Sequence, residues 1–348
     1  MWRYILRRIG LIFVTAFIIL SLTYLLMKLL PMDKPLGRAD VQLAYYENQV
    51  NLGYMVRVHY EKGSPRPASD VIVVNELDPS QPYLYNAVPV FQQYVSWIKN
   101  IFTKWHWGTS SVIEPGSPAM LVIRRRLPVS LKLNIWAMVV SVPLGFLFGI
   151  WAALKKNTLT DHIITIVTMV FISVPSFVII TFLMKWFGFD TNLLPTQWPS
   201  VLAPAWERFK GYIIPVACLS FGTIAGFTRM TRAELTEIMS SEFLLLARTK
   251  GLTKTQSVLR HALRNALVPL VPMIIGQFVG LLGGSMVLEN LYGIPGIGSL
   301  FTEGITQKDY NLVMVVMSVY TMIGLFTTLI VDVSYGIVDP RIRMGARK

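Results

Sequence analysis

The stretch ARTKGLTKTQSVLRHALRNALVP, residues 247–269, interrupts a chain that is otherwise largely apolar. It contains five Lys or Arg residues and one His, but no Asp or Glu. Its pattern predicts two short helices that bend at Gly251, because glycine readily adopts the left-handed conformation that ends a helix. Thr253 and Gln256 have the spacing of a capping box, which predicts the start of the second helix. We therefore expect a basic helical segment that does not itself cross a bilayer.

The second of these helices is predicted to have two distinct faces. An apolar stripe at helical spacing is formed by Leu259, Ala262, Leu263 and Ala266. A second, mainly cationic stripe is formed by Ser257, Arg260, His261 and Arg264. Pro269 then marks the entry into the next apolar run. One face is suited to burial, and the other to an acidic protein partner or to anionic lipid headgroups.

The composition of the chain places it in the membrane. It has 348 residues, of which 53% are hydrophobic and only 15% charged, whereas a soluble protein carries about 25% charged residues. The net charge of +13 therefore matters through its position along the chain, and a nucleic-acid partner is not expected because the bilayer would occlude the basic helices. Cys218 is the only cysteine, which excludes an intrachain disulfide, and nothing in the pattern indicates a metal site.

Six apolar runs are long enough to cross about 30 Å of hydrocarbon. The first follows a basic start and is longer than a signal-peptide core, so we expect it to be retained as an anchor. The other five lie near 130–154, 163–187, 212–229, 267–288 and 312–335. Lys and Arg gather in the short segments on one side, which predicts six spans with both termini in the cytoplasm. Arg124, Arg125 and Arg126 fall on the other side, where we expect headgroup contacts or a folded loop.

These runs define the expected organisation of the chain. Residues 1–31 form an N-terminal transmembrane helix, 32–126 an extracytoplasmic lobe, 127–339 a core of five transmembrane helices, and 340–348 a cytoplasmic tail. The core includes a cytoplasmic loop at 230–266. The lobe contains a β-like run, DVIVV at 70–74, and we expect it to have mixed structure.

One helix of the lobe is expected to be amphipathic. Trp97, Ile98, Ile101, Phe102 and Trp105 recur on a single helical face. This predicts either an interfacial helix on the outer leaflet or a core helix of the lobe, and the pattern leaves both possibilities open.

Two carboxylates fall near the ends of predicted spans. Glu289 closes the fifth span and Asp332 lies near the cytoplasmic end of the last. Intramembrane carboxylates are functional candidates, but these near-terminal positions favour structural hydrogen bonding. They lie at opposite membrane faces, which argues against a membrane-embedded enzyme that uses both for acid–base chemistry. A secondary carrier would need charged groups near the midplane and inverted repeats, and the sequence shows neither.

Familiar nucleotide and metal motifs are missing from the sequence. It has no G-x-x-x-x-G-K-[ST] phosphate loop and no H-E-x-x-H metal motif. The run GIPGIG at 293–298 follows a span rather than a strand, so it does not have the context of a dinucleotide site. We interpret it as a turn or a gating segment at the outer mouth.

The basic segment resembles the cytoplasmic signature loop of bacterial ABC-importer permeases, whose pattern is roughly Glu-Ala-Ala, three residues, then Gly. Leu245, Leu246, Ala247 and then Gly251 stand at these positions, so the acidic residue and the first alanine are absent. The resemblance extends to the runs GTS at 108–110, RLPVSLKLN at 126–134, LENLYGIPGIGSLF at 288–301, KDY at 308–310 and VDVSYGIVDPRIR at 331–343. It covers the first span and about 100–348, and it is strongest to the B-type permeases of oligopeptide and dipeptide importers. Residues 33–95 have no clear counterpart in the shorter members.

This resemblance implies an all-α membrane protein with the six transmembrane helices of a type I ABC importer. It implies a non-enzymatic permease in the bacterial cytoplasmic membrane that imports peptides, with nickel or another small solute as the alternative cargo. The implied partners are a second homologous permease, two cytoplasmic ABC ATPases that bind ATP and Mg and contact the 242–266 loop, and an extracytoplasmic peptide-binding protein. The chain itself would bind no cofactor and no metal.

The resemblance also assigns roles to particular residues. The implied ATPase-coupling residues are Glu242, Ala247, Arg248, Thr249, Lys250, Gly251 and Leu252. Possible structural or gating residues are Glu289, Gly293, Pro295, Gly296, Gly298 and Asp332. No pattern in the sequence assigns the residues that bind the substrate.

Overall fold

The structure is a computed structural model that describes residues 2–30, 35, 38–59, 71–73, 83–249, 251–280 and 285–338. These residues group into two compact units. Unit 1 comprises 1–12, 129–299 and 323–348, and unit 2 comprises 13–128 and 300–322. The predicted cytoplasmic tail at 340–348 lies outside the described residues.

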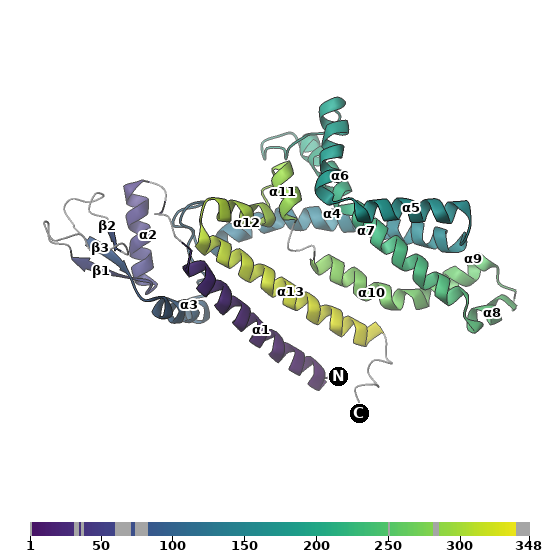
Figure 1. The fold of residues 1–348 in the computed structure, drawn as a ribbon, viewed down its shortest axis with the longest axis horizontal. Coiled ribbons are helices and arrows are strands. Elements are labelled where there is room, and N and C mark those ends of the chain that lie inside the picture. The colour runs from purple at the N-terminus through teal and green to yellow at the C-terminus, as the bar shows by residue number, and fades with distance from the viewer. Residues whose placement is uncertain are drawn as a thin grey trace. The chain divides into compact units, whose positions relative to one another are not determined.

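The described part of the chain is mainly helical (Figure 1). Its long helices are α1 (Trp2–Lys28), α4 (Ala119–Leu154), α7 (Ala205–Met239), α10 (Leu263–Gly280) and α13 (Tyr310–Val338). By length and composition, five of the described helices can cross a membrane, and the total is six if a bent pair formed by α5 (Leu159–Ser173) and the helical segment that follows it counts as one span. The predicted spans therefore correspond to helices of the structure.

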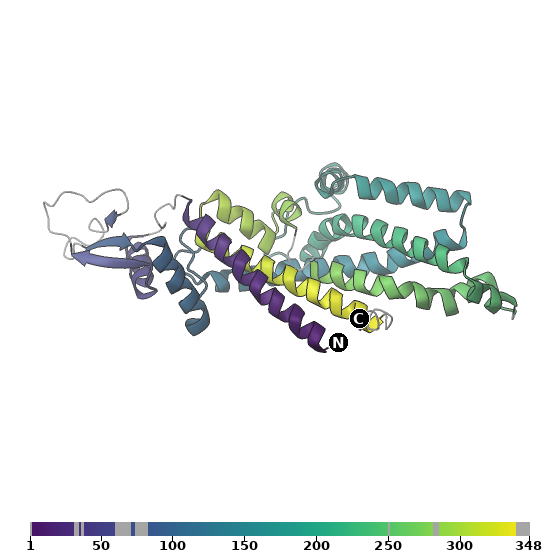
Figure 2. The same cartoon turned by 60° about the horizontal axis from the view of Figure 1, so that its bottom comes forward.

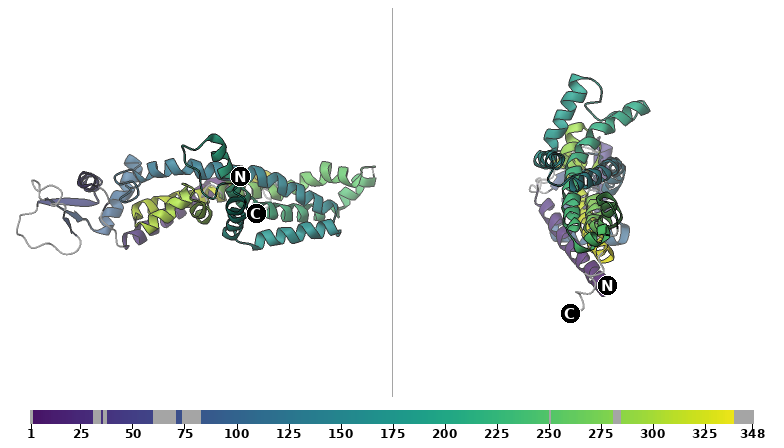
Figure 3. Two further views of the ribbon diagram at one scale, coloured as in Figure 1. Left: turned by 90° about the horizontal axis from the view of Figure 1, so that it is seen from above. Right: turned by 90° about the vertical axis from the view of Figure 1, so that its right-hand side faces the viewer.

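The third predicted span is not one straight helix. α5 ends at Ser173, and α6 (Ser176–Leu183) continues into the π-helical segment η1 (Met184–Asp190) at an angle of 101° to α5. Figures 1 and 3 show α6 standing across the direction of α5. The break falls at Val174, whose backbone is extended (φ −85°, ψ 122°). Its cause is Pro175, because a proline disfavours helical backbone in the residue before it.

The other spans differ from their predicted limits mainly at their ends. α4 begins at Ala119, so Arg124, Arg125 and Arg126 lie in its first turns rather than in a loop. Within unit 2, Arg125 forms an ion pair with Glu114 at 2.7 Å. The three arginines interrupt an otherwise apolar helix that begins AMLVI at 119–123, which is why hydropathy alone placed the start of the helix too late.

Within unit 1, α4 packs closely against α7. A side-chain carbon on Gly145 would lie 2.5 Å from Cβ of Phe227, and one on Gly149 would lie 2.5 Å from Cβ of Thr231. The two glycines are four residues apart and therefore share one face of α4, as in other close contacts between membrane helices. The hydroxyl of Thr228 donates to the carbonyl of Gly145 at 3.3 Å. Figure 2 shows that α7 also runs beside α10, a pair of helices that are in contact.

We expect Gly149→Ala to destabilise the protein by about 1–3 kcal/mol, because its methyl group would overpack the contact with α7. The matched control is Gly324→Ala in α13, where an added Cβ meets no atom within 4 Å. The measurement is the thermal unfolding midpoint of both variants in detergent. Equal midpoints would contradict the role given to this contact.

The lobe of unit 2 has mixed structure, as expected. It contains α2 (Ala39–Asn51), β1 (Met55–His59), β2 (Val71–Val73), β3 (Tyr83–Ala87) and α3 (Val90–Lys104). The strand order is β1-β3-β2 with both pairs antiparallel, and β2 is the predicted β-like run. α2 contacts β1 beside the sheet (Figure 1). Tyr45, Tyr46 and Tyr85 form the buried core between α2 and the sheet.

α3 contributes to the core of the lobe, which is the alternative that the sequence left open. Trp97 and Ile101 are buried, and the Trp97 indole N–H donates to the carbonyl of Trp107 at 3.1 Å. Phe102 and Trp105 lie on the outside, with 82% and 67% of their surface exposed. The predicted single face is therefore divided between a buried half and an exposed half.

Candidate functional site

The basic segment folds locally as its sequence predicts. α8 (Glu242–Thr249) is followed by Gly251, whose φ of +94° is in the left-handed range that favours glycine. α9 (Lys254–Ser257) then begins with a reciprocal capping box. The Thr253 N–H donates to Oε1 of Gln256 at 3.1 Å, and the Gln256 N–H donates to Oγ1 of Thr253 at 3.2 Å. Figure 3 shows this turn at one end of the helices of unit 1.

The second helix is not a separate short element, which corrects the prediction. α9 passes through the π-helical segment η2 (Val258–Ala262) directly into α10, and Thr255–Phe278 is one candidate span. Pro269 lies inside α10 and does not interrupt it. The apolar stripe continues across this proline as Ala262, Ala266 and Leu270, all fully buried, so packing holds the helix together.

The polar stripe was also predicted only in part. Arg260, His261 and Arg264 are exposed as expected, but Ser257 is fully buried. Its hydroxyl donates to the carbonyl of Thr253 at 2.9 Å, which satisfies it within its own turn. The π-helical segment follows directly, so ideal α-helical spacing does not describe the faces of this region.

The bend is anchored in a buried apolar cluster. Leu244 of α8 packs in one cluster with Ala153 of α4, Leu235 of α7 and Val258, and the stripe of α10 belongs to the same cluster. The next two side chains of α8 point the other way: 62% of the surface of Leu245 and 59% of that of Leu246 is exposed. α8 is therefore fixed to the ends of three long helices on one side and presents leucines on the other.

The predicted coupling residues all belong to this bend, although not all are described. Glu242 and Thr249 are exposed on α8, Gly251 is exposed at the bend, and Leu252 is half-buried. For Ala247 and Arg248 only the place in α8 is described, and Lys250 lies outside the described residues.

The turn at residues 285–299 is organised around Glu289. This side chain is fully buried in α11 (Met286–Tyr292). Oε1 of its carboxylate accepts from the Ser130 hydroxyl at 2.8 Å. Oε2 accepts from the N–H groups of Gly298 at 2.7 Å and of Ser299 at 3.0 Å. Burial raises the pKa of the Glu289 carboxyl above its ordinary value, and these hydrogen bonds act in the opposite direction.

The glycines of this turn have distinct physical roles. Gly293 ends α11 with φ +67°. A side chain on Gly296 would lie 2.3 Å from Oε2 of Glu289, and one on Gly298 would lie 2.9 Å from the same atom. These two positions allow the backbone to enclose the carboxylate, and Pro295 precedes them in the turn. The structure thus brings Glu289, Gly296 and Gly298 into one cluster.

Asp332 belongs to a different cluster of unit 1. Its carboxylate lies 3.1 Å from the Arg8 guanidinium, which pairs α13 with α1. Glu289 and Asp332 therefore have separate partners, as expected from their positions at opposite ends of the predicted spans.

Two further buried carboxylates were not predicted from the sequence. Asp161 is 1% exposed and accepts from Nε and Nη2 of Arg232 at 2.6 and 2.8 Å, which ties α5 to α7. Asp309, in unit 2, accepts from the backbone N–H groups of Ser111, Val112 and Ile113 at 3.1–3.2 Å. The only sequence signal for Asp309 was that it lies in KDY, one of the family motifs.

Asp161→Ala is expected to lower the free energy of unfolding by about 2 kcal/mol, because it leaves the Arg232 guanidinium without its acceptors. The control is Asp190→Ala, which removes an exposed ion pair with Lys185 and is expected to cost less than about 1 kcal/mol. Chemical denaturation in detergent measures both. If Asp190→Ala lowered the free energy of unfolding as much as Asp161→Ala does, burial of the ion pair would not determine the loss of stability.

The fold and these clusters define a multi-pass helical membrane protein whose buried polar clusters tie its helices together and whose basic bend is anchored to three helix ends. The family of binding-protein-dependent transport system inner membrane components matches residues 145–344. The chain belongs to this family. It is therefore a transport component of the cytoplasmic membrane and not an enzyme, and its mainly helical, multi-pass fold agrees with the predicted one.

Curated relatives extend this similarity over the whole chain. It is similar to the dipeptide transport system permease protein DppB of Lactococcus lactis, with 34% identity over 99% of this chain and 100% of the relative. DppB of Bacillus subtilis is 29% identical over 99% of both chains. The oligopeptide transport system permease protein OppB of Escherichia coli is 36% identical over 73% of this chain and 81% of the relative. The two dipeptide permeases thus also match the 33–95 segment, for which the sequence analysis named no counterpart.

Proposed function

We propose that this chain is the permease subunit of an ATP-driven importer of dipeptides or oligopeptides and forms half of the translocation path. The observation that carries the proposal is the anchored bend, in which α8 is fixed by Leu244 and presents Leu245 and Leu246 outward. Similarity to dipeptide permeases over 99% of the chain supports peptides rather than nickel as the cargo.

The charge and the exposure of the bend support the proposed ATPase partners. Two cytoplasmic ABC ATPases would bind ATP and Mg and would receive α8 and the exposed Arg260, His261 and Arg264. Acidic ATPase side chains would complement this basic surface. A second homologous permease would complete the path, and an extracytoplasmic peptide-binding protein would deliver the substrate.

The coupling step is mechanical. Closure of the ATPases on ATP would push α8, and the buried cluster around Leu244 would pass this displacement to the ends of α4, α7 and α10. Densely packed apolar clusters move as units rather than deform. The helices would then move between inward-open and outward-open arrangements.

The orientation follows from this docking role. The bend faces the cytoplasm, and with six spans both termini do as well. The lobe of α2, α3 and the sheet would then lie outside, where it is available to the binding protein.

The test is uptake of a radiolabelled dipeptide by proteoliposomes that contain this chain with its ATPases and second permease, with the peptide-binding protein added outside. We expect uptake only when ATP is enclosed on the ATPase side, and none by the isolated chain. Uptake by the isolated chain driven by an ion gradient, or labelling of His261 from the outside, would overturn the proposal.

A further inference from the structure

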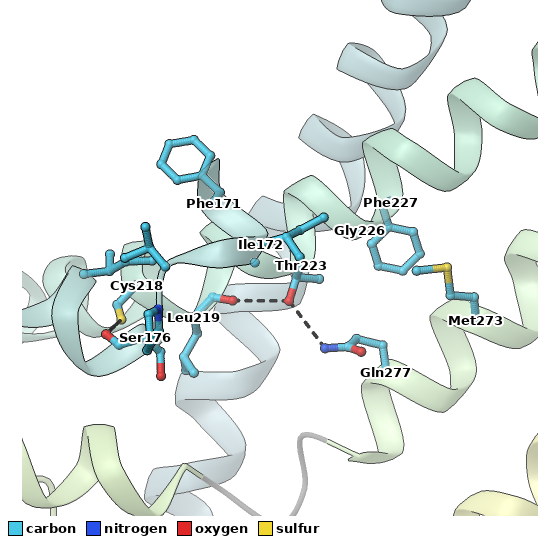
Figure 4. Close-up of a pocket in the computed structure, with 14 residues that line it drawn as sticks. Phe171, Ile172, Ser176, Cys218, Leu219, Thr223, Gly226, Phe227, Met273 and Gln277 are labelled. Atoms are coloured by element: carbon cyan, nitrogen blue, oxygen red, sulfur yellow. Dashed lines mark hydrogen bonds between the residues drawn. The ribbon is translucent and has the colours of Figure 1, made fainter. Parts of the chain in front are cut away.

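A pocket of about 480 Å³ lies in unit 1 at the break between α5 and α6 (Figure 4). Its volume falls within the range of about 300–1,000 Å³ that small-molecule sites occupy. Its walls come from both sides of the break and from the facing surfaces of α7 and α10. Nothing in the sequence pattern indicated a site here.

The break removes a backbone hydrogen bond beside this pocket. In a straight helix the carbonyl of Phe171 would accept from the N–H of residue 175, but Pro175 has no N–H. Phe171, Val174 and Pro175 all line the pocket. Non-helical backbone at membrane depth is tolerated where protein buries it or where it lines a cavity. In secondary transporters, broken helices commonly form the substrate site.

The opposite wall carries an uncharged polar pair. The Thr223 hydroxyl donates to the carbonyl of Leu219 at 3.2 Å, and Nε2 of Gln277 lies 3.4 Å from Oγ1 of Thr223. Figure 4 shows both side chains between the Leu219 end and the Phe227–Met273 end of the pocket. The pair joins α7 to α10, and its hydroxyl and amide can donate as well as accept hydrogen bonds.

The remaining lining determines which ligand fits. The fourteen lining residues, all described, include no Asp, Glu, Lys, Arg or His. The lining therefore offers neither the carboxylates nor the imidazoles that hold a divalent metal ion, nor a charge to pair with a peptide terminus. It offers apolar surface together with amide-like donors and acceptors. A peptide backbone with varied side chains matches this combination.

We propose that this pocket is a transient binding site for the backbone of the transported peptide, which forms hydrogen bonds with Thr223 and Gln277. The inference rests on the proposed function and adds to it the place and the chemistry of substrate contact. Because the lining carries no charge, the pocket binds peptides weakly and with little dependence on their sequence. Weak binding lets the peptide leave the pocket and cross the membrane.

The chain offers a matched pair of glycines for the test. Gly222 lines the pocket, and a Cβ added there meets no atom within 4 Å. Gly324 in α13 is equally open and does not line the pocket. Gly222→Leu therefore fills the pocket without a clash at Cβ, and Gly324→Leu makes the same change elsewhere in unit 1.

The experiment measures uptake of radiolabelled dialanine by the complete transporter in proteoliposomes. Thr223→Val combined with Gln277→Leu should raise the KM about tenfold, which corresponds to the loss of one to two hydrogen bonds. Gly222→Leu should lower uptake at least as much, and Gly324→Leu should stay within about twofold of the unmodified transporter.

Direct contact is tested by alkylation of the thiol introduced by Gly222→Cys in a Cys218→Ala background. Dialanine present during ATP turnover should slow its modification by N-ethylmaleimide. Unaltered uptake by the pocket variants would overturn the pocket proposal alone, and so would modification of this thiol at the same rate with and without dialanine. No uptake by the unmodified transporter would overturn the proposed function and this inference with it.

Discussion

Gly251→Pro is expected to abolish peptide uptake while the protein still inserts into the membrane. The φ of Gly251 is +94°, and proline fixes φ near −65°, so the bend between α8 and α9 cannot form. The orientation of Leu245 and Leu246 relative to the buried cluster would be lost. The measurement is ATP-dependent uptake by proteoliposomes, normalised to inserted protein.

Graded variants separate backbone conformation from bulk at this position. A Cβ added to Gly251 meets no atom within 4 Å, so the cost of Gly251→Ala is that of left-handed backbone alone, about 1–2 kcal/mol. Gly251→Asn should retain more activity than Gly251→Ala, since asparagine tolerates this conformation better. If Gly251→Pro transports normally, the bend has no part in coupling.

The bend shows how far local sequence determines structure. Its capping box and left-handed glycine were predictable because each interaction joins residues within one turn. The burial of Ser257 was not predictable, because it follows from the π-helical segment at Val258–Ala262. A π-helical turn shifts the faces of a helix, and no residue type marks it in advance. Pro175 indicates the break of the third span in the sequence. The length of the apolar run, taken alone, predicted an unbroken helix.

The buried polar clusters show where local reasoning ends. Ser130 and Glu289 are 159 residues apart, and Asp161 and Arg232 are 71 apart. The sequence identified Glu289 as a functional candidate because carboxylates are costly near a membrane. It could not name the partner of Glu289, because helix packing decides which distant groups meet. The pocket was even less predictable from local sequence, since three separate parts of the chain form its walls.

Glu289→Ala is expected to have the largest structural effect of any substitution in the turn at residues 285–299. It removes the acceptor of three donors at once, namely the Ser130 hydroxyl and the N–H groups of Gly298 and Ser299. A buried donor left without an acceptor costs about 1–3 kcal/mol. Even with partial relaxation, we expect a loss of roughly 3 kcal/mol and a parallel loss of uptake. Thermal unfolding in detergent and dipeptide uptake measure the two effects.

Two further substitutions show whether Glu289 acts through these hydrogen bonds. Glu289→Gln keeps the shape but places an NH2 group where an acceptor is needed, so its effect should lie between those of the wild type and Glu289→Ala. Glu207→Ala in α7 removes an exposed glutamate that pairs with Lys210 at 3.1 Å and should change stability by less than about 1 kcal/mol. A Glu289→Ala protein that unfolds at the wild-type temperature but does not transport would assign Glu289 to gating. Wild-type values of both measurements would remove it from either role, because a fully buried acceptor of three hydrogen bonds cannot be deleted without cost if those bonds hold the turn.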